Sequence, residues 1–396
     1  MKNIYAFIIV FASLFVASIV VAQEPHDAQV SHEPTEHANP CEEKGEHKTD
    51  YTNMMIHHIG NSNEFEVIPG VFTIPLPVLT YSADGGFNFA MSSAFHEGEE
   101  GHIAHKGYVL NHGVINRIKG SFPAEDTKVE ITHTHDGKAV VCHNGVVYEL
   151  EGCANMLESS SFYDFSISKN VFSMLFGILL LAFIFIRLAN FYKANTQKAP
   201  SGLNAILEVM VTFIRDEVAK PMIGKRYNEF MPILLAFFFF ILVNNLIGLT
   251  PLGINVTGNI SVTLVLAVAA FIVTNINGNR NYWGHILAMP GVPKPILFLL
   301  TPVEIIGVFT KPISLMIRLF ANMTAGHIII MALIGLIFVF GDMGESLPGA
   351  ITGSILAIPF TLFLSLIELV VAFIQAFIFA MLVASYIGGA IEEAHH

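Results

Sequence analysis

The C-terminal half of the chain carries a few ionisable side chains whose types suit proton transfer. Arg318, His327 and Glu368 stand within long stretches of mostly apolar residues. A charged group at the centre of a bilayer costs about 2.5–3.5 kcal/mol on insertion scales, so each such residue indicates a function. Histidine, with an ordinary pKa of about 6.5, exchanges protons near neutral pH, whereas arginine stays protonated. These types favour an ion path in which a permanent cation accompanies a titratable pair.

The two stretches that carry these residues are longer than a bilayer crossing requires. They cover Pro295–Gly341 and Pro348–Ile391 and are separated by a short polar turn. At 1.5 Å per residue, a helix over residues 302–340 is about 58 Å long, whereas the hydrocarbon core of a bilayer is about 30 Å thick. Such a helix must be strongly tilted or bent, with a long side presented to another component in the membrane.

An antiparallel hairpin centred near Gly344 brings particular residues to the same level. His327 and Glu368 stand 17 and 24 residues from that centre, and Arg318 and Gln375 stand 26 and 31 residues from it. The two differences, 7 and 5 residues, nearly agree. One modest stagger therefore predicts that His327 lies near Glu368 and that Arg318 lies near Gln375.

The two ionisable residues on the first of these helices are predicted to face different surroundings. Arg318 and His327 are nine residues apart, which places them about 13.5 Å apart on opposite faces of a helix. One face could meet a partner while the other lines a polar path. Asn322 and Thr324 could line this path or make hydrogen bonds between packed helices. Gly326 is interpreted as a packing residue.

Three shorter apolar runs precede the hairpin and bring the number of predicted crossings to five. They cover Val171–Ile186, Phe230–Leu249 and Ile260–Ile276, each close to the roughly 17–25 residues of a membrane helix. The segments after the first and third runs are interpreted as loops and contain Lys and Arg, whereas Leu252–Asn259 contains neither. Because cytoplasmic loops are enriched in these residues, the pattern predicts a periplasmic N-terminal part and a cytoplasmic C-terminus.

Charge divides the chain into two unlike parts. Only 13% of its 396 residues are charged, against about 25% in typical soluble domains. Residues 23–168 contain 22 acidic and 7 basic residues, whereas residues 169–396 contain 10 and 12. The net charge of −12 provides no basic field for nucleic acid, and the composition excludes an ordinary cytosolic enzyme. We therefore predict a polytopic membrane protein with an acidic exported part.

The first 50 residues contain no predicted globular structure. Residues 1–22 are typical of a secretory signal peptide. They consist of Lys2 followed by an apolar run that ends in small and aliphatic residues. The alternative is an uncleaved membrane helix. Residues 23–50 lack apolar periodicity and are predicted to be disordered. The histidines of this tail could bind a metal transiently, but their spacing favours a solvated tail: His26, His32, His37 and His47.

Residues 51–168 form a predicted β-rich periplasmic domain. Apolar and polar residues alternate in its segments, which are separated by Gly, Asp and Asn turns. His133 and His135 precede an Asp-Gly turn and would share one face of a hairpin strand. They are interpreted as exposed strand residues, with a metal site as the alternative. Cys142 and Cys153 could form a disulfide in an oxidising compartment.

The predicted fold class is an all-α polytopic membrane protein with about five transmembrane helices, the last two a long tilted hairpin. A small β-rich periplasmic domain precedes the membrane domain, which covers residues 169–396.

The segment Lys311–His327, KPISLMIRLFANMTAGH, resembles the signature of subunit a of F-type ATP synthases. Arg318 stands at the position of that family's arginine, and Glu304 stands fourteen residues before it, as in the family. Asn245 resembles the family's asparagine near the end of the second run. The Ile-His-His at residues 56–58 is similar to the His-His before the first helix of the family.

The resemblance extends to the last helix, with two departures. Ile367–Ile387 resembles the last helix of the family, and Gln375 matches its glutamine. Many bacterial members have Glu nine residues after the arginine and His seven before the glutamine, whereas here the positions hold His327 and Glu368. The exchange keeps one residue of each type, which supports a proton-exchanging pair. The insertion at about residues 63–155 is absent from the common bacterial pattern.

The resemblance implies a non-catalytic, proton-translocating subunit of the bacterial inner membrane. Its implied partners are the c-ring, the b subunit of the peripheral stalk, the other subunits of the ATP synthase complex and the lipid bilayer, without a cofactor. Protons would enter past His327 and Glu368, reach a carboxylate of the ring and leave on the far side of Arg318. The remaining implied residues of the path are Gln375, Glu304, Asn322 and Asn245.

Two other functions were weighed against this one. A self-contained ion-coupled secondary transporter would show paired inverted repeats with interrupted helices, and no repeat relates residues 171–276 to 295–391. A periplasmic metal-binding module would need one membrane anchor rather than five crossings. The sequence contains no GxxxxGK[ST] loop for nucleotide phosphates. It leaves open whether the coupling ion is H⁺ or Na⁺.

Overall fold

A computed structural model of the chain describes most of residues 62–392. The gaps in this range are 69–71, 98–100, 112, 121, 124–125, 134–138, 154–159, 195–198, 251–253, 288, 290–291 and 343–345. The predicted signal peptide, the histidine-rich tail, the Ile-His-His at 56–58 and His135 lie outside the described residues. The chain divides into two compact units. The β-rich unit runs to Ser173, and the helical unit contains Met174–Leu249 and the residues from Asn255 onward.

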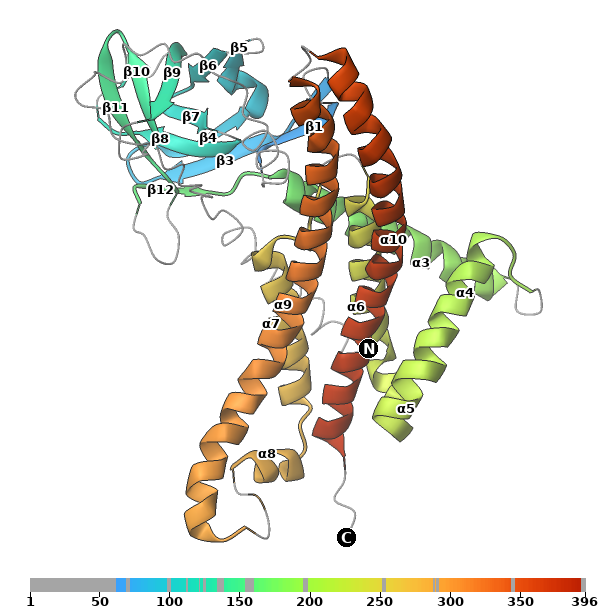
Figure 1. The fold of residues 1–396 in the computed structure, drawn as a ribbon. Coiled ribbons are helices and arrows are strands. Elements are labelled where there is room, and N and C mark those ends of the chain that lie inside the picture. Colours follow the sequence, from blue (N-terminus) through green and yellow to red (C-terminus); the bar gives the residue numbers. More distant parts are fainter. Residues whose placement is uncertain are drawn as a thin grey trace. The chain divides into compact units, whose positions relative to one another are not determined.

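Three antiparallel sheets are formed by the described residues of the β-rich unit (Figure 1). Strands β1 and β2 pair with each other, a seven-stranded sheet has the order β5-β6-β9-β10-β11-β8-β7, and a three-stranded sheet has the order β12-β3-β4. The strands are β1 (Glu64–Ile68), β2 (Phe72–Pro75), β3 (Pro77–Ser82), β4 (Gly86–Met91), β5 (His96–Glu97), β6 (Gly101–Ala104), β7 (Tyr108–Asn111), β8 (Val114–Ile118), β9 (Thr127–His133), β10 (Ala139–His143), β11 (Val146–Glu151) and β12 (Phe162–Asp164). The prediction of a β-rich N-terminal domain is confirmed.

Buried and exposed side chains alternate along the strands, and the buried ones form the core of this unit. Phe95, Ile115 and Phe162 are completely buried in one apolar cluster, to which β3, β4, β7, β8 and β12 contribute. The hairpin expected around residues 136–137 exists, since β9 and β10 pair with His133 opposite Ala139. Among the described residues, no group of three or more potential ligands could hold a metal ion.

The cysteine pair considered from the sequence is not formed. Cys142 is disulfide-bonded, whereas Cys153 carries a thiol, so these two residues are not joined to each other. Cys153 lies in the apolar cluster of the β-rich unit. Burial, followed by the nearby Asp164 carboxylate, raises the pKa of this thiol to about 11. Its place in the core makes Cys153 a packing residue rather than a reactive one.

Within the part of the chain that the structure describes, four helical stretches are long and apolar enough to cross a membrane, or five if one bent pair counts as a span. The bent pair is α7 with α8, which meet at 105°. The elements, counted from the helix that joins the two units, are α3 (Lys169–Ala194), α4 (Leu203–Phe213), the π-helix η2 (Ile214–Ala219), α5 (Lys220–Ile223), the 3-10 turn η3 (Gly224–Arg226), α6 (Tyr227–Gly248), α7 (Ile260–Ile276), α8 (Arg280–Leu287), α9 (Lys294–Phe340) and α10 (Leu347–Ile391).

The predicted long hairpin is formed by α9 and α10, which run side by side in Figure 1. They contain 47 and 45 residues, so each is about 70 Å long at 1.5 Å per residue. The turn falls where it was expected, with Gly341 next to Ala350 across it. Gly353 is needed there because an added Cβ would lie 3.1 Å from the Ile337 Cα. The hairpin therefore fixes which residues of the two helices lie at the same level.

Two segments interpreted as loops are in fact partly helical. Residues 187–229 include α4, η2 and α5, whose apolar side chains at helical spacing, such as Leu207, Ile214 and Val218, are buried. The interspersed charges concealed this pattern in the sequence. The connector at 281–294 overlaps α8, and the preceding Asn279 donates its backbone N–H and its Nδ2 to the carbonyls of Ala390 and Ile391. Asn279 therefore caps the C-terminus of α10.

Candidate functional site

Glu368 lies in the interior of the α9–α10 hairpin. Its side chain is on α10, it is 6% exposed, and its carboxylate has no hydrogen-bond partner among the described residues. The carboxylate is directed at Gly326 of α9, where an added Cβ would stand 2.8 Å from Oε1. Gly326 was interpreted as a simple packing residue, but its missing side chain makes room for this carboxylate. His327 is the next residue of α9 and is half-buried, and its approach to Glu368 stays a prediction.

Asn245 connects α6 to α10 one turn beyond Glu368. It is completely buried, and its Nδ2 donates to the carbonyl oxygen of Ala372 over 3.2 Å. Its Oδ1 accepts a 2.7 Å hydrogen bond from the hydroxyl of Thr257. Because an unpaired buried polar group costs about 1–3 kcal/mol, these bonds explain how an amide is accommodated in an apolar bundle. Asn245 therefore positions α10 between Glu368 and Gln375.

The segment after α6 returns into the bundle and supplies polar groups that the sequence did not reveal. Asn255 and Thr257 are 5% and 0% exposed. The Nδ2 of Asn255 donates to the carbonyl of Met323 on α9 over 3.5 Å, and its Oδ1 accepts from the N–H of Gly258. Thr324 of α9 also donates its hydroxyl to the Gly258 carbonyl, over 3.4 Å. This segment therefore links α6 to the part of α9 between Arg318 and His327.

Arg318 occupies an outward face of α9. Leu315, Leu319 and Met323 form the buried face of the same turns, each 3% exposed or less. Arg318 and Asn322 are exposed instead, one turn apart. The prediction that Arg318 and His327 meet different surroundings agrees with this geometry. An exposed guanidinium on a long apolar helix leaves a permanent cation available to a partner outside the chain.

Two contacts bracket the level of Arg318 in the hairpin. Gly326 meets Glu368 on one side of it, and the Lys311 ammonium lies 5.4 Å from the centre of the Tyr386 ring on the other. Interpolation between these contacts places Arg318 within about one turn of Gln375 along the helices. Gln375 is 7% exposed, so it faces the bundle interior while Arg318 faces outward. The two share a level, and no described contact joins them.

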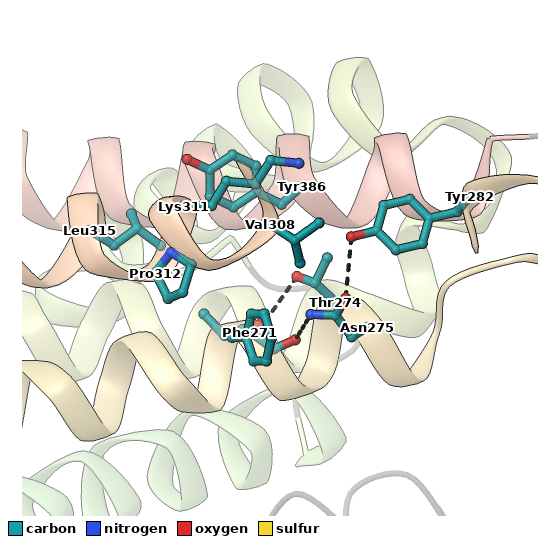
Figure 2. Close-up of a pocket in the computed structure, with 10 residues that line it drawn as sticks. Phe271, Thr274, Asn275, Tyr282, Val308, Lys311, Pro312, Leu315 and Tyr386 are labelled. Carbon is teal, nitrogen blue, oxygen red and sulfur yellow. Dashed lines mark hydrogen bonds between the residues drawn. The ribbon is translucent and has the colours of Figure 1, made fainter. Parts of the chain in front are cut away.

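A small pocket lies at the Lys311 end of this region, between α7, α9 and α10 (Figure 2). Its polar groups are held within the protein, because the Tyr282 hydroxyl donates to Asn275 and the Asn275 amide donates to the Phe271 carbonyl. Its volume of about 10 Å³ accommodates about one water molecule. The pocket is therefore a small recess with a mainly apolar lining.

The remaining predicted residue is not part of these clusters. Glu304 is half-buried on α9, fourteen residues before Arg318. Gly326, Asn255 and Thr257 were missed as site residues. The asparagine and threonine carried one usable signal, because they lie in a short connector between apolar runs that contains neither Lys nor Arg.

Comparison with known proteins identifies the helical unit. Residues 171–388 match the protein family described as ATP synthase A chain, which covers more than half of the 396 residues. The chain belongs to the ATP synthase A chain family. Every predicted residue of the site lies within this match. Residues 54–140 match a second family, described as a domain of unknown function, which covers much of the β-rich unit.

Individual relatives carry the same name. ATP synthase subunit a of Chloroherpeton thalassium is 44% identical over 238 residues, 59% of this chain and 69% of the relative. The corresponding protein of Chlorobium phaeobacteroides strain BS1 is 44% identical over 240 residues, 59% of this chain and 68% of the relative. ATP synthase subunit a of Myxococcus xanthus is 41% identical over 239 residues, 59% of this chain and 75% of the relative. The chain is therefore a multi-pass membrane component of an ATP synthase.

Proposed function

We propose that the chain is the proton-conducting stator subunit of an F-type ATP synthase. It forms two half-channels beside a ring of c subunits and couples proton flow to rotation of the ring. The subunit makes and breaks no covalent bond itself. ATP synthesis takes place elsewhere in the complex.

The exposure of Arg318 carries this proposal. A permanent cation on the outward face of a 47-residue apolar helix is costly in lipid and is accommodated by an anionic partner. A carboxylate on a neighbouring c subunit is such a partner. Arg318 keeps the passing carboxylate ionised, and because it does not release its own proton it separates the two half-channels.

The polar residues on the other side of the hairpin suit the entry path. His327 and Glu368 exchange protons at the interior of the hairpin, and Gly326 supplies the space for the carboxylate. Asn245, with its hydrogen bonds to Thr257 and to the backbone of α10, holds that carboxylate at the right depth. Gln375, Asn322 and Glu304 complete the lining of the two half-channels.

Orientation and partners follow from the same proposal. Residues 51–168 are a periplasmic domain, residues 169–396 are the membrane domain in the bacterial inner membrane, and the C-terminus is cytoplasmic. The preceding residues are a signal peptide, 1–22, and a histidine-rich acidic tail, 23–50. The α9–α10 hairpin faces the c-ring, and the b subunit of the peripheral stalk holds the chain against rotation. Family membership supports this assembly over a self-contained secondary transporter.

Purification in mild detergent tests the assembly. An affinity-tagged chain expressed in its own membranes is expected to bring a c-ring and a b subunit with it. The complex, reconstituted into vesicles, is then expected to synthesise ATP in response to an imposed pH gradient without added Na⁺. Purification of the chain alone would contradict the stator role. Synthesis that requires a Na⁺ gradient would retain that role and refute protons as the coupling ion.

A further inference from the structure

One face of the three-stranded sheet in the β-rich unit is covered with exposed aromatic side chains. In the register of β12, β3 and β4, Tyr163 stands beside Tyr81, and Tyr81 stands beside Phe87. Phe87 and Phe89 of β4 are 73% and 63% exposed, and Tyr163 is 51% exposed. Tyr81, Met91 and Phe165 extend the same exposed surface. We call this set, Tyr81, Phe87, Phe89, Met91, Tyr163 and Phe165, the aromatic face.

The aromatic face is not required for the core of its own unit. The opposite side of the sheet provides the core residues Val78, Ala90 and Phe162. The only charged residue within the three strands is Asp164, which is 4% exposed on that opposite side. A contiguous, charge-free aromatic surface on a folded unit marks an interaction site.

A short segment of chain connects the aromatic face to the start of α3. Phe165 and Ile167, directly after β12, continue to pair with β3 through their N–H groups, which donate to the carbonyls of Leu79 and Pro77 over 2.8 and 3.0 Å. The next residues begin α3 at Lys169, whose N–H donates to the Ser62 carbonyl. Lys169–Ala194 is one of the helices long and apolar enough to cross a membrane. The last residue that pairs with β3, Ile167, therefore lies two residues before the start of that helix.

Exposed aromatic side chains also occur in the first two turns of this helix. Phe172 in the first turn of α3 is 38% exposed, and Phe176 one turn later is 52% exposed. Tyr163 precedes Lys169 by six residues, which span at most about 20 Å of extended chain. Tyrosine and other aromatic side chains are favoured at membrane–water interfaces, where one end is apolar and the other is hydrated.

A polar recess lies at the edge of the sheet. Phe87 shares it with Asn88, Lys106 and Arg117, and its volume is about 170 Å³. The Lys106 ammonium donates to Asn88, and the Arg117 guanidinium contacts Asp84 at 3.6 Å and donates to Ser161. Glu151 stands opposite Arg117 in the register of β11 and β8 and accepts a hydrogen bond from the same Ser161, so two carboxylates balance the two cations of this recess.

We propose that the aromatic face rests on the lipid surface at which α3 enters the membrane. The β-rich unit is then a lipid-docked module that holds its sheet against the headgroup region. The aromatic rings lie at the level of the glycerol backbone.

Tryptophan fluorescence of the full chain in phosphatidylcholine vesicles tests this docking. Trp283 is the only tryptophan of the sequence, so a Trp283→Phe background accepts single reporters. Phe87→Trp and, independently, Tyr163→Trp place a reporter on the aromatic face. Val146→Trp is the matched control, because Val146 is 50% exposed on β11 of the seven-stranded sheet. Each variant is measured in ordinary lipid and in lipid brominated near the headgroup end of its acyl chains.

Docking on lipid predicts that both face reporters lose at least half of their fluorescence in brominated lipid. The control is expected to lose less than a tenth, and Phe89→Glu in the Phe87→Trp variant is expected to reduce the quenching to the level of the control. Face reporters that iodide quenches as readily as it quenches the control would overturn the proposal. Reporters shielded from iodide but unaffected by brominated lipid would overturn it too, because protein would then cover the face.

Discussion

Substitution of Gly326 by alanine probes the space in which Glu368 lies. The new Cβ would stand 2.8 Å from the Glu368 Oε1, whereas ordinary van der Waals contact begins at 3.4 Å. The carboxylate must therefore withdraw by about 0.6 Å. The displaced atom is the end of a flexible side chain, so the hairpin itself can keep its backbone. The substitution should alter the proton path without preventing folding.

The size of the effect follows from the cost of a displaced rotamer. A side chain forced about 30° from its preferred rotamer loses about 0.5–1.5 kcal/mol. If proton transfer requires Glu368 in its original position, this cost lowers the rate about 2- to 13-fold, at 1.36 kcal/mol for each factor of ten. The assay is ATP-driven proton uptake into inverted membrane vesicles, followed by a pH-sensitive dye and normalised to the amount of assembled complex.

Gly307→Ala is the matched control on the same helix. No atom lies within 4 Å of a Cβ at this position, so its proton uptake should equal that of the unmodified complex. Gly326→Ala should assemble to the same level and keep its ATP hydrolysis while proton uptake declines. Uptake equal to that of Gly307→Ala would refute the assigned position of Glu368. Loss of assembly would show that Gly326 is needed for packing instead.

Three further changes have separate outcomes. Exchange of both members of the pair, His327→Glu with Glu368→His, should retain more proton uptake than either single change, and a double variant no better than the worse single one would refute the pairing. Asn245→Leu removes two buried hydrogen bonds and should destabilise the subunit by about 1–3 kcal/mol, measured as a lower unfolding midpoint in detergent; an unchanged midpoint would contradict the network. Gly388→Ala, whose Cβ would lie 2.0 Å from a backbone oxygen of α5, should lower that midpoint, whereas Gly389→Ala, with no atom nearby, should leave it unchanged.

The positions of residues along the hairpin were predictable because each residue of an α-helix adds the same length along the helix axis. With a short turn between two antiparallel helices, the count from Gly344 predicts that Glu368 lies level with His327, and the contact that the structure shows at this level joins Glu368 to Gly326. The role of Gly326 itself was not predictable, because a glycine in a membrane helix commonly serves close packing. Only the direction of the Glu368 side chain distinguishes the two roles.

Other features of the structure could not be predicted, because the residues that determine them form no periodic pattern in the sequence. The buried Asn255 and Thr257 belong to a connector whose polar residues find partners far along the chain, on α6 and α9. The helices between residues 203 and 223 combine an apolar face with charged residues, and the charges suggested a loop. The outward position of Arg318 depends on which face of α9 packs against its neighbours, and that is a tertiary property.

Arg318 provides the most direct test of the account. In inverted vesicles, the complex with Arg318→Ala is expected to assemble normally and to hydrolyse ATP, yet to show no ATP-driven proton uptake. Arg318→Lys, which keeps a cation but not the guanidinium fork, is the companion variant. Coupled proton uptake retained by Arg318→Ala would contradict the claim that this exposed cation separates the two half-channels.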